Sequence, residues 1–143
     1  MATAFSIQKI VEYAATDMAG IVHHAEFFRY MEEVEHAFLR SVGLSVFEAV
    51  DGRRVSWPRV SCSFDFKKAL RFEDVFELNL WIERLGDRSV TYRVDVTKDG
   101  ELAAVGRSTS VCCEMTHPGE MRSIPIPARV RSLLETGPLS GTP

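Results

Sequence analysis

The chain has 143 residues, of which 45% are hydrophobic and 26% charged, and its formal net charge at pH 7 is −3. This length and composition predict one globular domain and exclude an intrinsically disordered chain. The small negative charge gives no electrostatic reason to expect a nucleic acid partner. No apolar run approaches the roughly 20 residues of a membrane-spanning helix. Three cysteines, two of them adjacent, make a poor disulfide framework, so we expect a protein of the reducing cytoplasm.

The first part of the chain predicts a strand and then one long helix. Alternating apolar residues indicate a strand over Phe5–Tyr13, and a turn-rich crossing follows over residues 14–22. From His24 to Val42, apolar residues recur three or four positions apart, which is typical of a helix with one buried face. These residues are Phe27, Met31, Val34, Phe38 and Val42. Gly43 fits a C-terminal cap, and we expect a short helical turn over Leu44–Val50.

The rest of the chain is mostly predicted as strand. Period-two alternation indicates the strands Val55–Lys67 (with an irregularity at Pro58), Val75–Leu85, Ser89–Thr97 and Glu101–Met115. Tight turns are expected at residues 86–88 and 98–100, and a bend near Gly106. A short helix over Arg129–Glu135 and a frayed tail over residues 137–143 complete the chain. An antiparallel sheet needs its apolar face covered, and the long helix can cover it, so the predicted class is α+β.

Reactive side chains gather between the first strand and the long helix. The carboxylate of Asp17 precedes a helix start, where unpaired backbone N–H groups carry partial positive charge. A carboxylate beside such donors can attack a carbonyl, or direct water at it, while the donors hold its oxygen. A histidine, such as His24, is suited to proton transfer near neutral pH. The ordinary alternatives are that Asp17 is a helix cap and that Tyr13 only ends a strand.

The order Tyr13, Thr16-Asp17, Gly20, Val22, His24 and Phe27-Phe28 resembles the opening motif of the 4-hydroxybenzoyl-CoA thioesterase family and its relatives, including the Tol–Pal-associated subgroup. Weaker similarities follow at residues 30–33, 38–40 and 67–74, so the resemblance covers about residues 5–115. Two positions depart from the family pattern. Glu26 stands where the family usually has Asn, and Ala69 where it often has Pro.

The resemblance implies a hotdog fold, in which a curled antiparallel sheet wraps around one central helix. Residues 1–130 would form this domain, and residues 131–143 a short helix and a flexible tail. It also implies an acyl-CoA thioesterase with Asp17 as nucleophile or general base. His24 and Tyr13 would complete the catalytic group, and helix amides would form the oxyanion hole. The expected substrate-binding residues are Gly20, Val22, Glu26, Phe27, Phe28, Met31, Lys67, Lys68 and Arg71.

Lys67, Lys68 and Arg71 are expected to bind the coenzyme A phosphates, with an ordinary solvated loop as the alternative. No metal or redox cofactor is expected. The resemblance further implies a homodimer or homotetramer with sites formed between subunits. A hydratase acting on acyl thioesters and a non-catalytic acyl-CoA-binding module are the competing functions. The acyl group stays open between aromatic, short aliphatic and branched acids, as does the choice between an anhydride intermediate and water attack.

Overall fold

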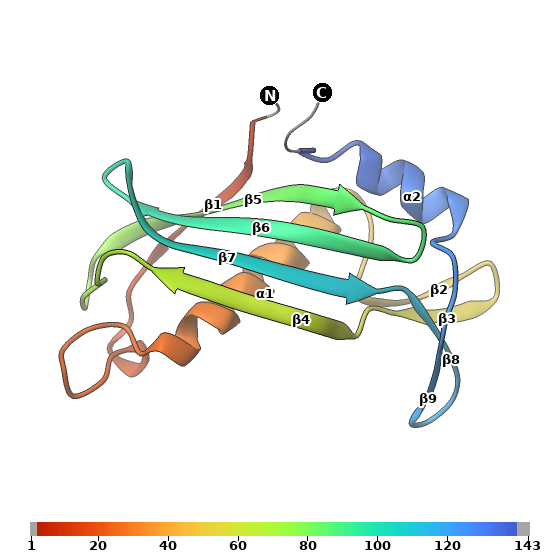
Figure 1. The fold of residues 1–143 in the computed structure, drawn as a ribbon, viewed down its shortest axis with the longest axis horizontal. Helices are drawn as coiled ribbons and strands as arrows, with labels where there is room; N and C mark the ends of the chain where they lie inside the picture. Colours follow the sequence, from red (N-terminus) through yellow and green to blue (C-terminus); the bar gives the residue numbers. More distant parts are fainter. Residues whose placement is uncertain (1–2, 140–143) are drawn as a thin grey trace.

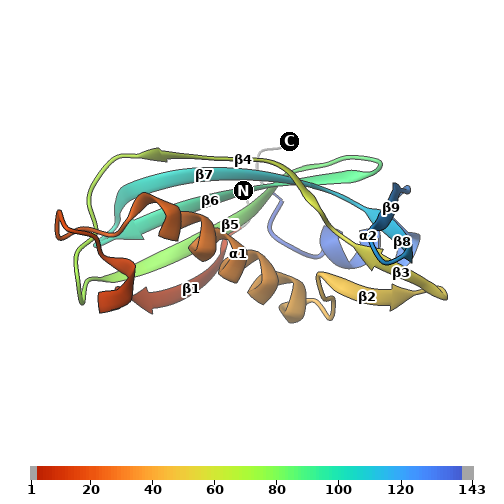
Figure 2. The same cartoon turned by 90° about the horizontal axis from the view of Figure 1, so that it is seen from below.

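The computed structural model describes residues 3–139, and within them one curled antiparallel sheet wraps around a long helix (Figure 1). The sheet has the strand order β1-β5-β6-β7-β4. Figure 2 shows the helix, α1 (His24–Ser41), lying along the concave face of this sheet. A smaller sheet of order β2-β3-β8-β9 and the helix α2 (Ala128–Glu135) lie at the end away from the start of α1. The predicted α+β architecture is confirmed.

The bounds of the strands show which of the strands predicted from the sequence are present. The strands of the large sheet are β1 (Phe5–Ile10), β4 (Arg59–Phe66), β5 (Val75–Leu85), β6 (Ser89–Lys98) and β7 (Glu101–Val111). Those of the small sheet are β2 (Phe47–Val50), β3 (Arg53–Ser56), β8 (Cys113–His117) and β9 (Glu120–Ser123). The predicted strand Val75–Leu85 is confirmed at both ends, and the predicted hairpins on either side of β6 are present.

The helix α1 follows the predicted apolar stripe, and its predicted range is confirmed to within one residue. Phe27, Met31, Val34 and Phe38 are buried in the core. The helix ends in a Schellman arrangement, because the N–H of Gly43 donates to the carbonyl of Arg40 (3.1 Å) and the N–H of Leu44 to that of Leu39 (2.8 Å). Gly43 has φ +86°, a conformation that favours glycine, so its predicted capping role is confirmed.

Several predicted elements differ from the structure, and the first three differ for local reasons. Leu44–Val50 is not helical; its second half is β2, which pairs with β3 through a turn in which Asp51 and Gly52 both have positive φ. The predicted strand Val55–Lys67 is two strands, β3 and β4. The irregularity predicted at Pro58 is confirmed, because Pro58 lies between them and has no N–H to donate. The first strand ends at Ile10, and Tyr13 begins a 3-10 turn, η1 (Tyr13–Ala15).

The long strand predicted over Glu101–Met115 changes sheet at Cys112, between β7 and β8, rather than bending at Gly106. Gly106 instead keeps the regular register opposite Phe64 and Val94. A Cβ atom at Gly106 would lie 2.6 Å from the Phe64 ring and 2.7 Å from Cε of Met31. The absence of a side chain at Gly106 therefore allows α1 and the aromatic ring of Phe64 on β4 to pack closely against the sheet.

The helix α2 confirms the short helix predicted near the C-terminus, and its Val130 and Leu134 are buried in the same core as α1. The predicted frayed tail is wrong for residues 137–139. The N–H of Ile82 donates to the carbonyl of Pro138 at 2.8 Å, and Leu139 forms a bridge with Ile82. Residues 140–143 lie outside the described part.

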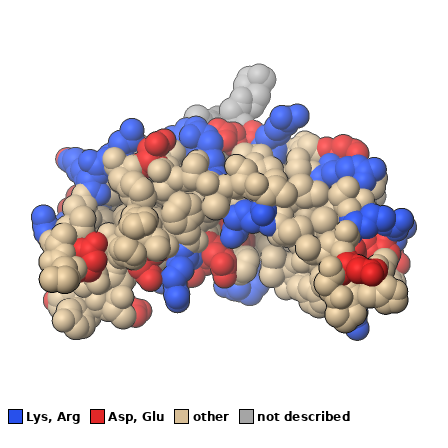
Figure 3. Space-filling view, turned by 60° about the horizontal axis from the view of Figure 1, so that its bottom comes forward, with Lys and Arg blue, Asp and Glu red and all other residues tan. Residues whose placement is uncertain are grey.

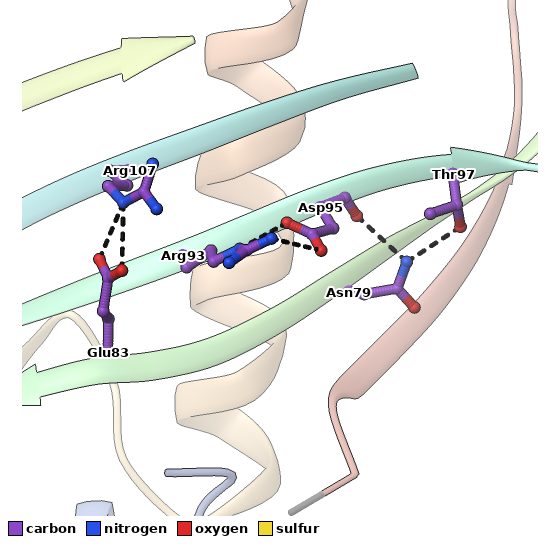
Figure 4. A network of polar contacts seen from close by, with 6 residues as sticks. All are labelled: Asn79, Glu83, Arg93, Asp95, Thr97 and Arg107. Atoms are coloured by element: carbon purple, nitrogen blue, oxygen red, sulfur yellow. Dashed lines mark hydrogen bonds and ion pairs between the residues drawn. The ribbon is translucent and has the colours of Figure 1, made fainter. Parts of the chain in front are cut away.

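The outer face of the sheet is polar, as the strand alternation requires. Leu78, Leu80 and Ile82 of β5 point inward and are buried. On the outer face the Nε of Arg107 donates to both carboxylate oxygens of Glu83, at 3.1 and 3.0 Å, and Arg93 binds Asp95 (Figure 4). The core therefore lies on the α1 side alone, and the site must be sought there or at the sheet edges. No helix within residues 3–139 is long and apolar enough to cross a membrane.

Candidate active site

The turn that carries Asp17 is fixed by its own backbone. The N–H of Asp17 donates to the carbonyl of Ile21 (2.9 Å), and the N–H of Gly20 donates to the carbonyl of Asp17 (2.9 Å). The N–H of Ala19 donates to Oδ1 of Asp17 at 2.8 Å, which orients the carboxylate. Gly20 has φ +77° with open space where a Cβ would stand, so the backbone conformation alone favours glycine here.

Two further backbone bonds hold this turn against its neighbours. The N–H of His23 donates to the carbonyl of Ala15 (2.9 Å), and that of Val22 to the carbonyl of Leu70 (2.8 Å). The turn is thereby tied to η1 on one side and to the loop between β4 and β5 on the other. Asp17 and residues 67–70, far apart in the sequence, are brought to the same place.

Two imidazoles stand beside the carboxylate. Nδ1 of His23 lies 3.8 Å from Oδ2 of Asp17, with both side chains partly exposed. The ring of His24 lies against that of His23, with centroids 4.4 Å apart. His24 lines the cavity described below, together with Asp17. Only His24 was predicted as a site residue from the sequence, and the structure brings both rings to the site.

The site lies at the N-terminus of α1. His23 is the N-cap residue and makes no side-chain capping hydrogen bond. At the start of α1 the N–H of Glu26 donates to the carbonyl of His23 (2.9 Å), so among the described residues the unpaired amides that carry partial positive charge are those of His24 and Ala25. The end of α1 can therefore hold a carbonyl oxygen that becomes negative during reaction.

A cavity of about 380 Å³ opens between this turn and the loop that follows β4. Phe27 and Phe66 form its apolar wall, with ring centroids 5.0 Å apart. Phe64 extends the aromatic cluster and contacts both Phe27 and Phe28. The lining residues are Asp17, Ile21, Val22, His24, Phe27, Phe66, Lys67, Lys68, Ala69 and Leu70. The cavity thus joins an acidic group, an imidazole and an apolar wall.

The basic loop, which follows β4 and carries Lys67, Lys68 and Arg71, lies across the cavity from Asp17. The N–H groups of Lys67 and Lys68 both donate to the carbonyl of Ala103, at 2.7 and 3.0 Å. Lys68 forms an ion pair with Glu101. Lys68 also lines a neighbouring cavity of about 260 Å³, together with Lys98. On the face drawn in Figure 3, positive and negative side chains are interspersed with uncharged areas.

Arg71 lies further along this loop, and Asp74 fixes its backbone. The N–H of Arg71 donates to Oδ2 of Asp74 at 2.7 Å, and Lys98 lies 3.0 Å from Oδ1. The hydrogen bond from Arg71 and then the Lys98 contacts lower the pKa of Asp74 below its ordinary value. Asp74 is therefore ionised at neutral pH and can hold the loop in shape.

Several predicted residues lie outside the main cavity. Tyr13 is 78% exposed, and its ring packs edge-on against Phe72 at 5.9 Å. Glu26 faces a second cavity between β1 and α1, where its carboxylate lies 3.6 Å from Arg29. Met31 is fully buried beneath the aromatic cluster. Among the predicted substrate-binding residues, Val22, Phe27, Lys67 and Lys68 line the cavity, while Gly20 shapes the turn beside it.

Sequence reasoning missed His23 and the wall residue Phe66. The spacing of His23 from Asp17 carried no recognised pattern, and the turn alone brings them together. Phe66 could have been found, because Phe64 and Phe66 alternate with polar residues at the end of a predicted strand.

Comparison with known proteins supports the class of enzyme that the sequence motif implies, the thioesterases. The sequence model of the Thioesterase superfamily matches residues 19–105, beginning just after Asp17. A protein of Aquifex aeolicus is 36% identical over 122 residues, which cover 85% of this chain and 91% of that protein. The 4-hydroxybenzoyl-CoA thioesterase of Pseudomonas sp. is 26% identical over 134 residues, covering 90% and 95%. A crystal structure of a Thermus thermophilus protein has 29% identity and a TM-score of 0.80, covering 92% and 97%.

The curled sheet around α1 and these similarities define a hotdog-fold enzyme that hydrolyses thioesters. The chain belongs to the Thioesterase superfamily. Its general activity is that of an acyl-CoA thioesterase.

Proposed function

We propose that this protein releases a free carboxylic acid and coenzyme A by the action of Asp17 in the cavity at the start of α1. The observation that carries this proposal is that Asp17 and His24 line one cavity with an aromatic wall and two lysines. A thioester needs a positioned nucleophile or base and donors for its oxygen; Asp17 would be the first, and the amides at the start of α1 would be the second.

The thioester carbonyl would rest with its oxygen toward the first amides of α1. In one route the Asp17 carboxylate attacks the carbonyl carbon, the coenzyme A thiolate leaves, and water then hydrolyses the mixed anhydride. In the other route Asp17 takes a proton from a water molecule that attacks directly. His24 would donate the proton that the leaving thiolate needs. Both routes require the Asp17 carboxylate to lie beside the thioester carbonyl.

Lys67 and Lys68 would bind the coenzyme A phosphates at the mouth of the cavity, and Arg71 would add charge from the same loop. Phe27 and Phe66 would hold the acyl group, with Phe28 and Met31 supporting them from α1. The narrower membership of the 4-hydroxybenzoyl-CoA thioesterase family, and of its Tol–Pal-associated subgroup, is part of this proposal. So is a cytoplasmic location, which the three free cysteines fit.

We also propose that the protein is a homodimer joined at the edge strand β4, or a tetramer made of two such dimers. Seven of its eight residues are exposed, including Val60 (61%) and Phe66 (50%). β4 stands at the end of the sheet order, with β7 as its neighbour there. An edge of this length with exposed apolar side chains favours pairing with a second copy.

The test is a hydrolysis panel of acyl-CoA thioesters, with thiol release followed in parallel with acid formation. The proposal predicts release of both products from at least one substrate. Tight binding without turnover would favour an acyl-CoA-binding module, and hydration of an enoyl-CoA without thiol release would favour a hydratase. Sedimentation of the pure protein tests the dimer, which a monomer at micromolar concentration would contradict.

A further inference from the structure

Two further cavities against α1 are lined by carboxylates. One lies at Glu35, which is only 2% exposed; its Oε2 accepts a hydrogen bond from Arg59, and its Oε1 has no partner among the described residues. This cavity measures about 20 Å³, which is enough for a single water molecule. The other measures about 330 Å³ and lies between β1 and the first half of α1. Of the two, the second has the volume of a site for a small organic molecule.

The larger cavity has carboxylates that its own cations do not neutralise. Its charged lining residues are Lys9, Glu12, Glu26, Arg29 and Glu33. Nζ of Lys9 lies 2.5 Å from Glu33, so these two charges balance each other. The Arg29 side chain is 75% exposed and lies 3.6 Å from Glu26, and such a surface ion pair contributes little. Glu12 forms no ion pair within residues 3–139. Two carboxylates therefore remain for a cationic ligand.

The buried Tyr30 is a second and independent sign of a ligand site. It is 4% exposed, and its ring packs against Phe27 and Phe76 with centroids 6.0 and 5.0 Å apart, yet it lines this polar cavity. Its hydroxyl group makes no hydrogen bond to any residue that the structure describes. Burial, and then the charges of the three carboxylates, raise the pKa of Tyr30 to about 12, so the hydroxyl keeps its proton. A buried hydroxyl without a partner costs free energy, and a ligand in the cavity would supply the partner.

The arrangement of the carboxylates favours an organic cation over a metal ion. Within residues 3–139, no group of three His, Cys, Asp or Glu side chains could hold a metal ion. The carboxylates are therefore spread around the cavity, and a ligand that reaches more than one of them must have some length. An ammonium group has three N–H donors, which carboxylate and phenolic oxygens can accept.

We propose that this cavity is a binding site for a small organic cation with two ammonium groups, held by Glu12, Glu26 and the hydroxyl of Tyr30. Glu26 stands where the thioesterase family usually has Asn, so the site depends on a departure from the family pattern. The site is separate from the cavity that Asp17 lines, and the inference does not rest on thioester hydrolysis.

The site shares backbone with the turn that carries Asp17. Ala15 lines the second cavity, and its carbonyl accepts the N–H of His23 at 2.9 Å. The N–H of Glu26 donates to the carbonyl of His23, also at 2.9 Å. A cation bound by Glu26 therefore restrains the backbone on both sides of His23.

Calorimetric titration of the full chain with putrescine, a diamine, tests the binding. Butylamine, with one ammonium group, and butanediol, with none, are the matched ligands. We expect putrescine to bind about tenfold more tightly than butylamine, near the lower limit for a hydrogen bond to a charged group, and butanediol not to bind. The variant Glu12→Gln with Glu26→Gln should lose about the same factor in putrescine affinity. Tyr30→Phe keeps the buried ring, loses the hydroxyl and should weaken binding several-fold.

Two control variants locate the site. Asp17→Asn should bind putrescine as the wild type does, because Asp17 lines the other cavity. Glu120→Gln with Glu135→Gln removes the same charge from exposed positions on β9 and α2 and should also keep the wild-type affinity. The proposal is overturned if the wild type does not bind putrescine at millimolar concentration, if butylamine binds equally well, or if either control weakens binding as much as the Glu12/Glu26 variant.

Amide hydrogen exchange, followed by NMR, tests the link to the catalytic turn. With putrescine bound, the N–H of His23 should exchange several-fold more slowly, because its acceptor Ala15 lines the occupied cavity. The N–H of Gly86, which donates to the carbonyl of Ser89 in the β5–β6 turn, is the control and should not change. Unchanged exchange at His23, or equal slowing at both amides, would contradict the link. These measurements use no thioester, so the proposed hydrolysis can stand whatever their result.

Discussion

Oδ2 of Asp17 and Nδ1 of His23 lie 3.8 Å apart, across a turn whose backbone bonds fix both residues. The N–H of His23 is bound to Ala15, and the Asp17 carboxylate accepts the N–H of Ala19. We therefore propose that His23 orients the carboxylate, whereas His24 lines the cavity in which a substrate would lie. The two neighbouring histidines have different expected roles.

Substitution of each histidine by glutamine separates these roles. His24→Gln should lower kcat by about a hundredfold, because a proton donor to the leaving thiolate is lost. His23→Gln should have a smaller effect, since the turn still holds Asp17. The measurement is steady-state thiol release with the preferred acyl-CoA. A larger loss in His23→Gln than in His24→Gln would reverse the assignment.

Gly20→Ala tests how far the turn conformation matters. At φ +77° a side chain costs about 1–2 kcal/mol, and no neighbouring atom lies close enough to add a clash. We expect a lower free energy of unfolding and a lower kcat, because relaxation of the turn moves Asp17. The control is Gly52→Ala, which has φ +76°, also in open space, but lies in the β2–β3 hairpin. It should lose similar stability and keep its activity; equal losses of activity in both variants would contradict this account.

The basic loop is tested with paired substrates. Lys67→Ala should raise KM for an acyl-CoA several-fold and leave KM for the matching acyl-pantetheine nearly unchanged, because only coenzyme A carries the phosphates. The effect should shrink at high salt. Lys9→Ala is the control, since Lys9 pairs with Glu33 away from this loop. Equal changes in KM for both thioesters would remove Lys67 from phosphate binding.

The buried carboxyl group of Glu35 predicts a pH dependence of stability. Because burial raises its pKa above the ordinary 4.5, the folded protein holds this proton more tightly than the unfolded chain. The stability that it contributes is full below pH 4.5 and is lost as the pH rises through the raised pKa. Glu35→Gln does not titrate. Urea unfolding at several values between pH 4 and pH 8 should show the wild type losing free energy of unfolding relative to this variant as the pH rises. If the unfolding free energies of the wild type and Glu35→Gln change in parallel with pH, this prediction is contradicted.

The sequence predicted the elements whose patterns are repeated and local. The stripe from Phe27 to Phe38 and the Asp-Gly turn at residues 99–100 determine their own geometry, and both α1 and the β6–β7 hairpin were found. The hairpin of β2 and β3 was missed although it carries the same Asp-Gly signal at residues 51–52. Its short strands have too few residues to show a period of two.

The candidate site could be predicted from the contiguous family motif and from the later basic residues Lys67 and Lys68, which line the same cavity. Asp17, Gly20, Val22 and Phe27 lie in one stretch, and the structure gathers them at the start of α1. The contributions of Phe66, Ala69 and Leu70 depend on how the loop after β4 returns to the turn, which only the register of β4 against β7 determines. The pairing of Glu35 with Arg59 depends on a bulge that the sequence did not reveal.

The most direct test of the central claim is thiol release by Asp17→Asn, with the preferred acyl-CoA at saturating concentration. Circular dichroism and the urea midpoint of the variant should match those of the wild type, because the Asp17 side chain is partly exposed. The account predicts a fall in kcat of about a thousandfold or more, the scale on which a positioned base or nucleophile acts. A correctly folded Asp17→Asn protein that keeps the wild-type kcat would contradict it.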